Sequence, residues 1–309
     1  MKTLITGATG LVGTALIQIL IAEGHEVYRL KRPGGEGNEA VSGVSDATLD
    51  PRSGLVSTTN GGSAPTPLHV SAVVNLAGAP IAKGRWTPER KSLLRSSRVD
   101  TTRDLVEAIG KMQPRPEVLI SASAVGYYGN RGDEVLTEKS EAGGGFLAEV
   151  AKDWEAQARK GEDLGIRVVL ARFGIILSKQ GGALPEIMAP FKVGAGGTLG
   201  SGRQWMPWIG LDDAIRMIHR ALEDASFAGV INVVSPEPVR NAEFTRVLAE
   251  AMHRPALFAA PAFALRLAVG AEKAEALFLA SQRVVPGKLE ELGFTFVHGN
   301  LTSELAAAV

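Results

Sequence analysis

Three glycines near the start of the chain have the spacing of a nucleotide-binding turn. The segment Thr6-Gly7-Ala8-Thr9-Gly10-Leu11-Val12-Gly13 follows a short apolar run and precedes apolar residues at helical spacing. Glycine permits a tight turn at its first position, close approach of a pyrophosphate at the second and close helix packing at the third. The helix that follows offers free N–H groups and its positive dipole end to an anion. The pattern predicts a strand, a turn and a helix that bind a dinucleotide through this segment.

Two cations follow the second predicted strand, residues 26–30. In a dinucleotide-binding fold this strand end reaches the adenosine ribose, where an acid accepts from the 2′-OH of NAD and a cation suits the 2′-phosphate of NADP. Lys31 and Arg32 stand there, and no acid does. We therefore expect NADP(H) as the cofactor. The alternative is a solvated strand end that is basic by chance.

Two further predicted strands end in residues suited to a site, because ligands of open parallel sheets bind outside the carboxyl ends of the strands. Residues 71–78 end in small residues that let a cofactor pass close by, and residues 117–129 run from an apolar strand into hydroxyls and aromatics. The expected cofactor contacts at these two ends are Leu76, Ala77, Gly78, Ser121 and Ala122. The expected catalytic candidates are Ser123, Tyr127 and Tyr128.

The composition excludes several other chemistries. The 309 residues contain 33 Lys and Arg against 33 Asp and Glu, so no net charge favours nucleic acid or an anionic membrane as a partner. With no cysteine there is no thiolate nucleophile, and the five scattered histidines show no ligand spacing, so we expect no metal site. Strand-like residues begin at Thr3, which leaves no room for a signal peptide, and the apolar stretch 256–271 is interrupted by Pro261 and Arg266. We expect a soluble, cytoplasmic protein.

Alternating strand and helix patterns position these residues. A long helix over 88–109, a helix over 145–164, a strand over 166–173, a helix from 211 and a strand over 230–234 predict an α/β fold, with a Rossmann-type doubly wound parallel sheet. Residues 33–68 read as loop apart from a short strand near 48–50. We expect a dinucleotide-binding domain over 1–236 and a small, mostly helical C-terminal substrate lobe over 237–309.

A loop-rich insertion over about 178–210 is a candidate substrate-binding region. Arg203 would supply a cation for a diphosphate, and Trp205 and Trp208 would supply planar surfaces for a base or a sugar. The alternative is that these Trp side chains pack the lobe against the sheet.

The chain resembles the extended short-chain dehydrogenase/reductase superfamily, in particular its atypical branch of NAD(P)-dependent sugar-nucleotide epimerases with a C-terminal domain of the DUF1731 type. The matching segments are the glycine turn, Val74-Asn75-Leu76-Ala77-Gly78, Arg85-Trp86-Thr87, Ser96-Ser97-Arg98-Val99-Asp100-Thr101-Thr102, the segment 121–129, Arg172-Phe173-Gly174, Trp208-Ile209 with Asp212-Asp213, and Ser281-Gln282-Arg283-Val284-Val285-Pro286. The resemblance implies an NADP-dependent oxidoreductase or epimerase acting on a nucleotide-sugar or another small polar substrate. It also implies that Arg98, where the superfamily usually has Asn, reaches the cofactor.

One departure from the superfamily pattern affects the chemistry. The superfamily pairs a Ser, here matched by Ser123, with Tyr-x-x-x-Lys on the following helix, and alignment on Glu155 puts Leu147 and Ala151 at those two places. The proton donor must then be sought elsewhere, and we favour Tyr127 over Tyr128. A second hypothesis is an NADPH-binding regulatory or structural protein without turnover.

The resemblance also predicts a homodimer, because extended relatives pair the two helices 88–109 and 145–164 across a two-fold axis. The alternative is that helices of the tail lobe cover them.

Overall fold

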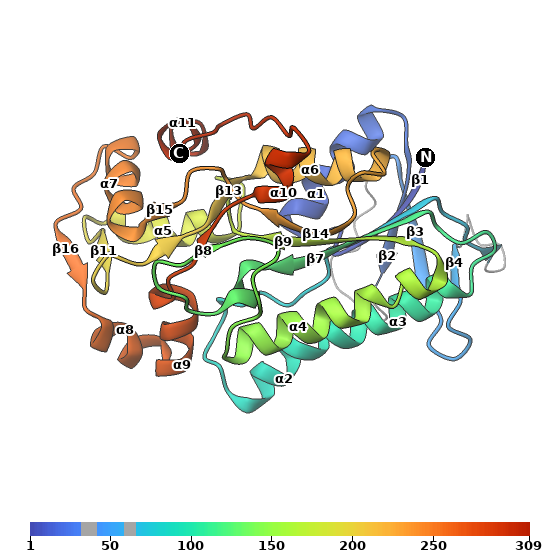
Figure 1. The fold of residues 1–309 in the computed structure, drawn as a ribbon, viewed down its shortest axis with the longest axis horizontal. Helices are drawn as coiled ribbons and strands as arrows, with labels where there is room; N and C mark the ends of the chain where they lie inside the picture. The colour runs from blue at the N-terminus through green and yellow to red at the C-terminus, as the bar shows by residue number, and fades with distance from the viewer. Residues whose placement is uncertain (32–41, 59–65) are drawn as a thin grey trace.

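A large, mostly parallel sheet runs through the centre of the protein (Figure 1). The structure is a computed structural model, which describes residues 1–31, 42–58 and 66–309. Arg32 lies outside the described residues. Within them the sheet has nine strands in the order β14-β9-β7-β6-β1-β2-β3-β4-β5. Their bounds are β1 (Lys2–Thr6), β2 (Glu26–Lys31), β3 (Val44–Leu49), β4 (Val56–Thr58), β5 (Thr66–Pro67), β6 (Ala72–Asn75), β7 (Val118–Ala124), β9 (Arg167–Phe173) and β14 (Gly229–Val233).

The sheet has a topological switch point, called the crossing point below, beside the glycine turn. Strands β14 to β3 are parallel, and β4 and β5 continue the sheet in antiparallel pairing. From β1 the chain builds outward to β3 and later returns to the other side of β1 as β6, so the order reverses between β1 and β6. Ligands of doubly wound sheets bind at such a point. The predicted fold class is confirmed.

Helices cover both faces of the sheet. On one face α1 (Leu11–Ala22) and α6 (Leu211–Glu223) share a buried cluster that includes Leu16, Ile215 and Ile218. On the other face α3 (Val99–Gly110) and α4 (Phe146–Arg159) lie side by side (Figure 1) over a second cluster. Because both faces are covered, the central strands are mostly apolar and buried, as β6 shows with every residue buried.

Three details differ from the sequence prediction. The helix expected over 88–109 is two helices, α2 (Pro88–Ser96) and α3, which meet at Ser97 and Arg98. The region 33–68 contributes strands β3 to β5 rather than one short strand. The insertion predicted to be loop-rich contains the helix α5 (Ala183–Lys192) and three short strands, β11 (Gly197–Leu199), β12 (Trp205–Met206) and β13 (Trp208–Gly210).

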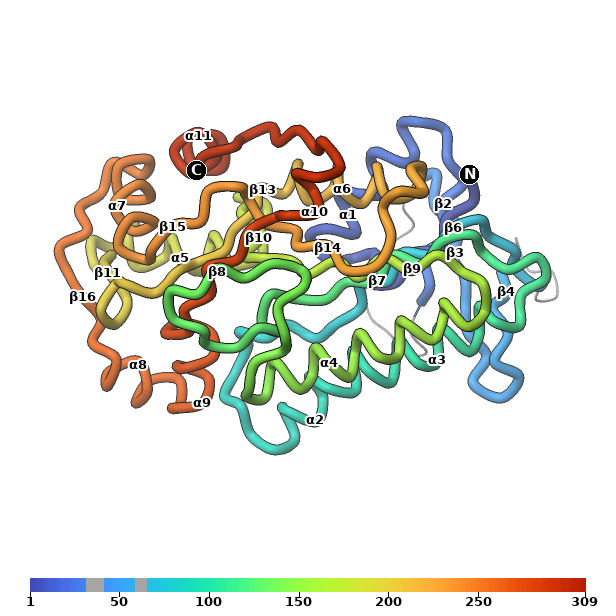
Figure 2. The backbone as a smooth tube through the Cα atoms, viewed as in Figure 1, coloured from blue at the N-terminus to red at the C-terminus, as the bar shows by residue number. Residues whose placement is uncertain are grey.

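The insertion and the tail build one lobe. Their shared core combines Leu177, Leu184 and Trp208 with residues of α7 (Asn241–Ala251) and α11 (Leu301–Ala308). Figure 2 follows the C-terminal segment from α10 (Gly287–Glu291) past α6 to α11, which packs beside α7. Short strand pairs complete the lobe: β10 (Ile175–Leu177) with β13, β11 with β16 (Phe258–Ala260), β12 with β15 (Val239–Arg240), and β8 (Val135–Leu136) with β17 (Arg283–Val284).

The apolar stretch 256–271 forms β16, α8 (Ala262–Val269) and the start of α9 (Ala271–Ala274). Lys273 of α9 donates to the carbonyls of Ala82 and Gly84, which attaches this part of the tail to the loop before α2. No helix in the described parts of the chain has both the length and the apolar character needed to cross a membrane.

Candidate cofactor and substrate site

The glycine turn between β1 and α1 leaves no room for a side chain at Gly7 or Gly13. Gly7 has φ +67°, and a Cβ on it would lie 2.5 Å from the carbonyl oxygen of Leu76. A Cβ on Gly13 would lie 2.4 Å from the carbonyl oxygen of Gly7. Gly10 caps α1, and no described side chain bonds to the N–H groups of the first turn. The turn therefore presents exposed backbone at the point where a pyrophosphate binds in this fold.

A buried polar seam lies beneath this turn. The Thr6 hydroxyl donates to Asn75 Oδ1 at 2.7 Å and accepts from the N–H groups of Leu76 and Ala77, both at 3.2 Å. Asn75 Nδ2 in turn donates to the hydroxyls of Thr102 and Ser121. Thr6 and Ser121, both predicted to contact the cofactor, therefore use their hydroxyls inside the protein to hold the ends of β1, β6 and β7 together.

The second strand ends as predicted in a cation, but that cation has a partner. Lys31 Nζ lies 2.6 Å from Asp46 Oδ2, and Arg29 bonds the other oxygen of the same carboxylate. Asp46 comes from β3, next to β2 in the sheet. Burial opposes the charge of Asp46, but its bonds to Lys31 and Arg29 give it a net lowered pKa. The sequence analysis considered only the residues at the end of the second strand. It therefore missed Asp46, which lies on a neighbouring strand.

Arg98 lies at the end of β6. Its guanidinium donates to the carbonyls of Ala79 and Leu94, each at 3.0 Å, and its Cζ would be 3.0 Å from a Cβ on Gly78. Burial, together with the charge of Arg90, lowers the pKa of Arg98 to about 10. The side chain, which comes from the junction of α2 and α3, therefore lies beside Gly78, one of the residues expected to contact the cofactor.

Ser123 belongs to a buried ionic network. Its hydroxyl donates to Glu155 Oε1 at 2.7 Å, and Arg172 makes a bidentate pair with the two oxygens of Glu155 at 2.7 and 2.8 Å. The side chains of Glu155 and Arg172 are 5% and 3% exposed. Burial disfavours the charge of Arg172, but its bonds to Glu155 give it a net raised pKa. The hydroxyl proton of Ser123, a predicted catalytic candidate, is thus donated to a buried carboxylate.

The two tyrosines occupy different environments. Tyr128 is fully buried, and its hydroxyl accepts from Arg172 at 2.9 Å and lies 2.6 Å from Asn232 Oδ1. Burial raises the pKa of this phenol. The burial of this side chain does not favour the prediction that Tyr128 is a catalytic candidate. Tyr127 is half-buried, with the Arg172 guanidinium 3.5 Å from its ring centre, and remains the candidate.

The three predicted substrate-binding residues also separate. Trp208 is 1% exposed, donates to the carbonyl of Glu237 and belongs to the lobe core, which favours the alternative that it packs the lobe. Trp205 is half-buried and donates to Asp133 at 2.7 Å, and the guanidinium groups of Arg240 and Arg283 lie 4.6 and 4.8 Å from its ring centre. The exposed Arg203 presents its carbonyl to Arg240. The sequence analysis did not identify Arg240 and Arg283, the two cations beside the Trp205 ring. Both border the predicted substrate-binding surface.

One signal could have revealed the buried network. Arg172 stands inside an otherwise apolar strand, and a cation buried in such a strand needs an anion on the helix that packs against it. Glu155 is the acid that α4 brings to this strand. The pairing needs the register of α4 on the sheet, which periodicity alone does not give.

A glycine turn at the crossing point of a doubly wound parallel sheet defines a dinucleotide-binding protein of the Rossmann type. The NAD dependent epimerase/dehydratase family matches residues 3–234, and a domain of unknown function, DUF1731, matches residues 260–308. The chain belongs to the NAD dependent epimerase/dehydratase family, and the resemblance found in the sequence is confirmed.

Similar proteins match over nearly their whole length. The epimerase family protein Mb2239 of Mycobacterium bovis is 41% identical over 98% of this chain and 96% of its own. The epimerase family protein YfhF of Bacillus subtilis is 37% identical over 100% and 98%. The crystal structure of the human epimerase family protein SDR39U1 (isoform 2) with NADPH superposes with a TM-score of 0.87 at 31% identity, over 100% of this chain and 99% of that one.

Proposed function

We propose that this protein is an NADP(H)-dependent oxidoreductase or epimerase that acts on a nucleotide-sugar or another small polar substrate. The observation that carries the proposal is the glycine turn, where a Cβ on Gly7 or Gly13 would strike neighbouring backbone, next to the first turn of α1, whose N–H groups have no side-chain cap. The presence of NADPH in the human relative's crystal structure supports the same cofactor here.

The residues at the crossing point fit this cofactor. The backbone from Thr9 to Val12 would hold the pyrophosphate, and Lys31, with Arg32 beyond the described residues, would hold the 2′-phosphate. To do so, the 2′-phosphate must compete with Asp46 for Lys31. When bound, the cofactor supplies a hydride donor or acceptor.

Calorimetry with NADPH and NADH tests the cofactor assignment. A charge-assisted phosphate contact contributes roughly 1.5–3 kcal/mol, so we expect Lys31→Ala with Arg32→Ala to weaken NADPH at least tenfold and to change NADH little. Lys2→Ala is a matched control, because Lys2 pairs with Glu26 at the other end of the neighbouring strands. Tighter binding of NADH than of NADPH by the parent protein would refute the assignment.

Tyr127 is the proposed proton donor or acceptor at the substrate oxygen. It is the half-buried one of the two tyrosines, and Arg172, held by Glu155, fixes its ring from one face. General acid/base groups contribute roughly 10²-fold or more, so Tyr127→Phe should reduce turnover by that factor while NADPH affinity stays unchanged. A variant that turns over substrate at the parent rate would end this assignment.

The second candidate function is an NADPH-binding regulatory or structural protein without turnover. Leu147 and Ala151 occupy the Tyr-x-x-x-Lys places, and Ser123 is bonded to Glu155, which favours this alternative. Oxidation of bound NADPH by a panel of carbonyl compounds separates the two. An enzyme oxidises the cofactor with at least one of them, and a pure binder oxidises it with none while still binding NADPH.

A further inference from the structure

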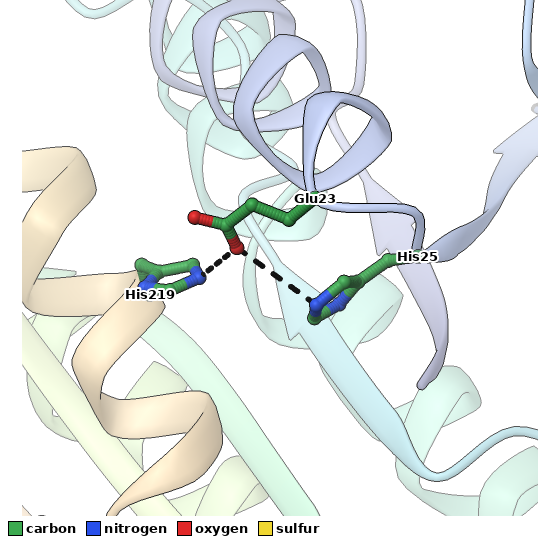
Figure 3. A group of neighbouring side chains, drawn as sticks. All are labelled: Glu23, His25 and His219. Atoms are coloured by element: carbon green, nitrogen blue, oxygen red, sulfur yellow. Dashed lines mark hydrogen bonds and ion pairs between the residues drawn. The ribbon is translucent and has the colours of Figure 1, made fainter.

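Two histidines and one glutamate meet at the end of the molecule opposite the glycine turn. Glu23, His25 and His219 point toward one another (Figure 3), and one ligand atom from each lies within 4.8 Å of the others. Nε2 of His219 is 2.5 Å from Glu23 Oε2, and Nε2 of His25 is 3.8 Å from the same oxygen. The sequence predicted no metal site because its histidines are scattered. The fold brings together residues almost two hundred positions apart.

The backbone holds this cluster in place. Glu23 caps the end of α1, Gly24 takes φ +78°, and the N–H of His25 bonds the carbonyl of Leu20. This turn places the side chains of Glu23 and His25 on the same side (Figure 3). His219 comes from α6, which is packed against α1 through the core of the same sheet face. All three side chains therefore project from well-packed backbone.

The electrostatics of the cluster favour a cation. Helices α1 and α6 both have their carboxyl ends here, and the negative end of a helix dipole attracts positive charge. Glu223 lies four residues after His219, one turn along α6, and its charge acts on the His25 imidazole.

We propose that Glu23, His25 and His219 bind a divalent transition metal of the zinc type, with Glu223 or water in the fourth position. Two imidazoles and a carboxylate are a zinc ligand set, whereas magnesium and calcium select oxygen ligands. Ligands of a tetrahedral zinc lie about 3.3 Å apart, given bonds of about 2.0–2.1 Å. That spacing falls between the two nitrogen–oxygen separations of Glu23 and within the 4.8 Å that bounds all three ligand atoms, so side-chain rotations would complete the site. The ion would clamp the turn between α1 and β2 to α6.

Calorimetric titration of the untagged, chelator-treated chain with zinc chloride tests the proposal. We expect one zinc per chain, and at least tenfold weaker binding for both His219→Ala and Glu23→Ala. His253→Ala is the matched control, because His253 is an exposed histidine on the lobe, and it should bind zinc as the parent does. Magnesium chloride should give no binding.

Cobalt supplies a second readout, which reports the coordination of the bound ion. Cobalt(II) in a four-coordinate nitrogen and oxygen site absorbs visible light more strongly than the hydrated ion, so the parent should show these bands and His219→Ala should lose them. Circular dichroism in the presence of a chelator would verify that each variant is folded. If His219→Ala does not fold, His25→Ala replaces it as the test variant. The proposal is overturned if zinc binds parent and folded variants equally, if it does not bind, or if cobalt stays hydrated.

Discussion

Glu304 makes stability depend on pH in a direction opposite to that of an ordinary carboxylate. This residue of α11 is buried, and its carboxylate rests against Gly210 at the start of α6, where a Cβ on Gly210 would lie 2.3 Å from Oε2. Burial, with the nearby charges of Asp213 and Asp212, raises its pKa from 4.5 to about 7. The folded chain therefore holds this proton more tightly than the unfolded chain. The stability that this proton confers is complete below about pH 4.5 and is lost as pH rises through about 7.

The difference between 4.5 and about 7 corresponds to about 3 kcal/mol at about 1.4 kcal/mol per pH unit. This is an upper limit, because the amino end of α6 stabilises some negative charge. Glu304→Gln removes the titration and keeps the shape. We expect the parent to lose up to that free energy of unfolding between pH 5 and pH 8, relative to the variant.

Urea unfolding at the two pH values measures the effect. The comparison between parent and Glu304→Gln removes the titrations that both share, and the exposed Glu291→Gln is a control that should follow the parent. The reasoning fails if Glu304→Gln and the parent lose the same free energy between pH 5 and pH 8.

Three further predictions follow from the site and the helices. Glu155→Gln should lower the free energy of unfolding by about 3 kcal/mol, because it leaves the buried Arg172 charge unpaired; urea unfolding within 1 kcal/mol of the parent would contradict this. Arg98→Ala should weaken NADPH by about tenfold in calorimetry, and parent-like affinity would show that Arg98 does not reach the cofactor. We also expect a homodimer through the α2–α3 and α4 face, and a purely monomeric sedimentation profile at micromolar concentration would count against it.

The sheet and its glycine turn could be predicted because each depends on local pattern. The strand 117–124 and the turn from Gly7 to Gly13 are contiguous segments whose residue types follow from burial and backbone geometry. The break at Ser97 and Arg98 could not be predicted in the same way. No glycine or proline marks the junction, and Thr87 and Pro88 supply a start signal for the first helix only.

The polar contacts of the site were harder to predict than its backbone. The sequence identified Lys31 and Ser123 but not the carboxylates of Asp46 and Glu155 that engage them, because each pair joins two elements whose register is set by packing. For the same reason it gave little basis for the preference for Tyr127 over Tyr128. The two are adjacent in sequence, and only the three-dimensional placement of Arg172 and Asn232 distinguishes them.

The shared core of the lobe has a consequence for the order in which this chain acquires its structure during synthesis. Leu177, Leu184 and Trp208 leave the ribosome before α7 and α11, which cover them. Helix α6 and strand β14, which belong to the sheet, are made between the two halves of the lobe. We therefore expect the nine described strands of the sheet to be made while the lobe is still open. The last eight-residue helix, α11, then closes it.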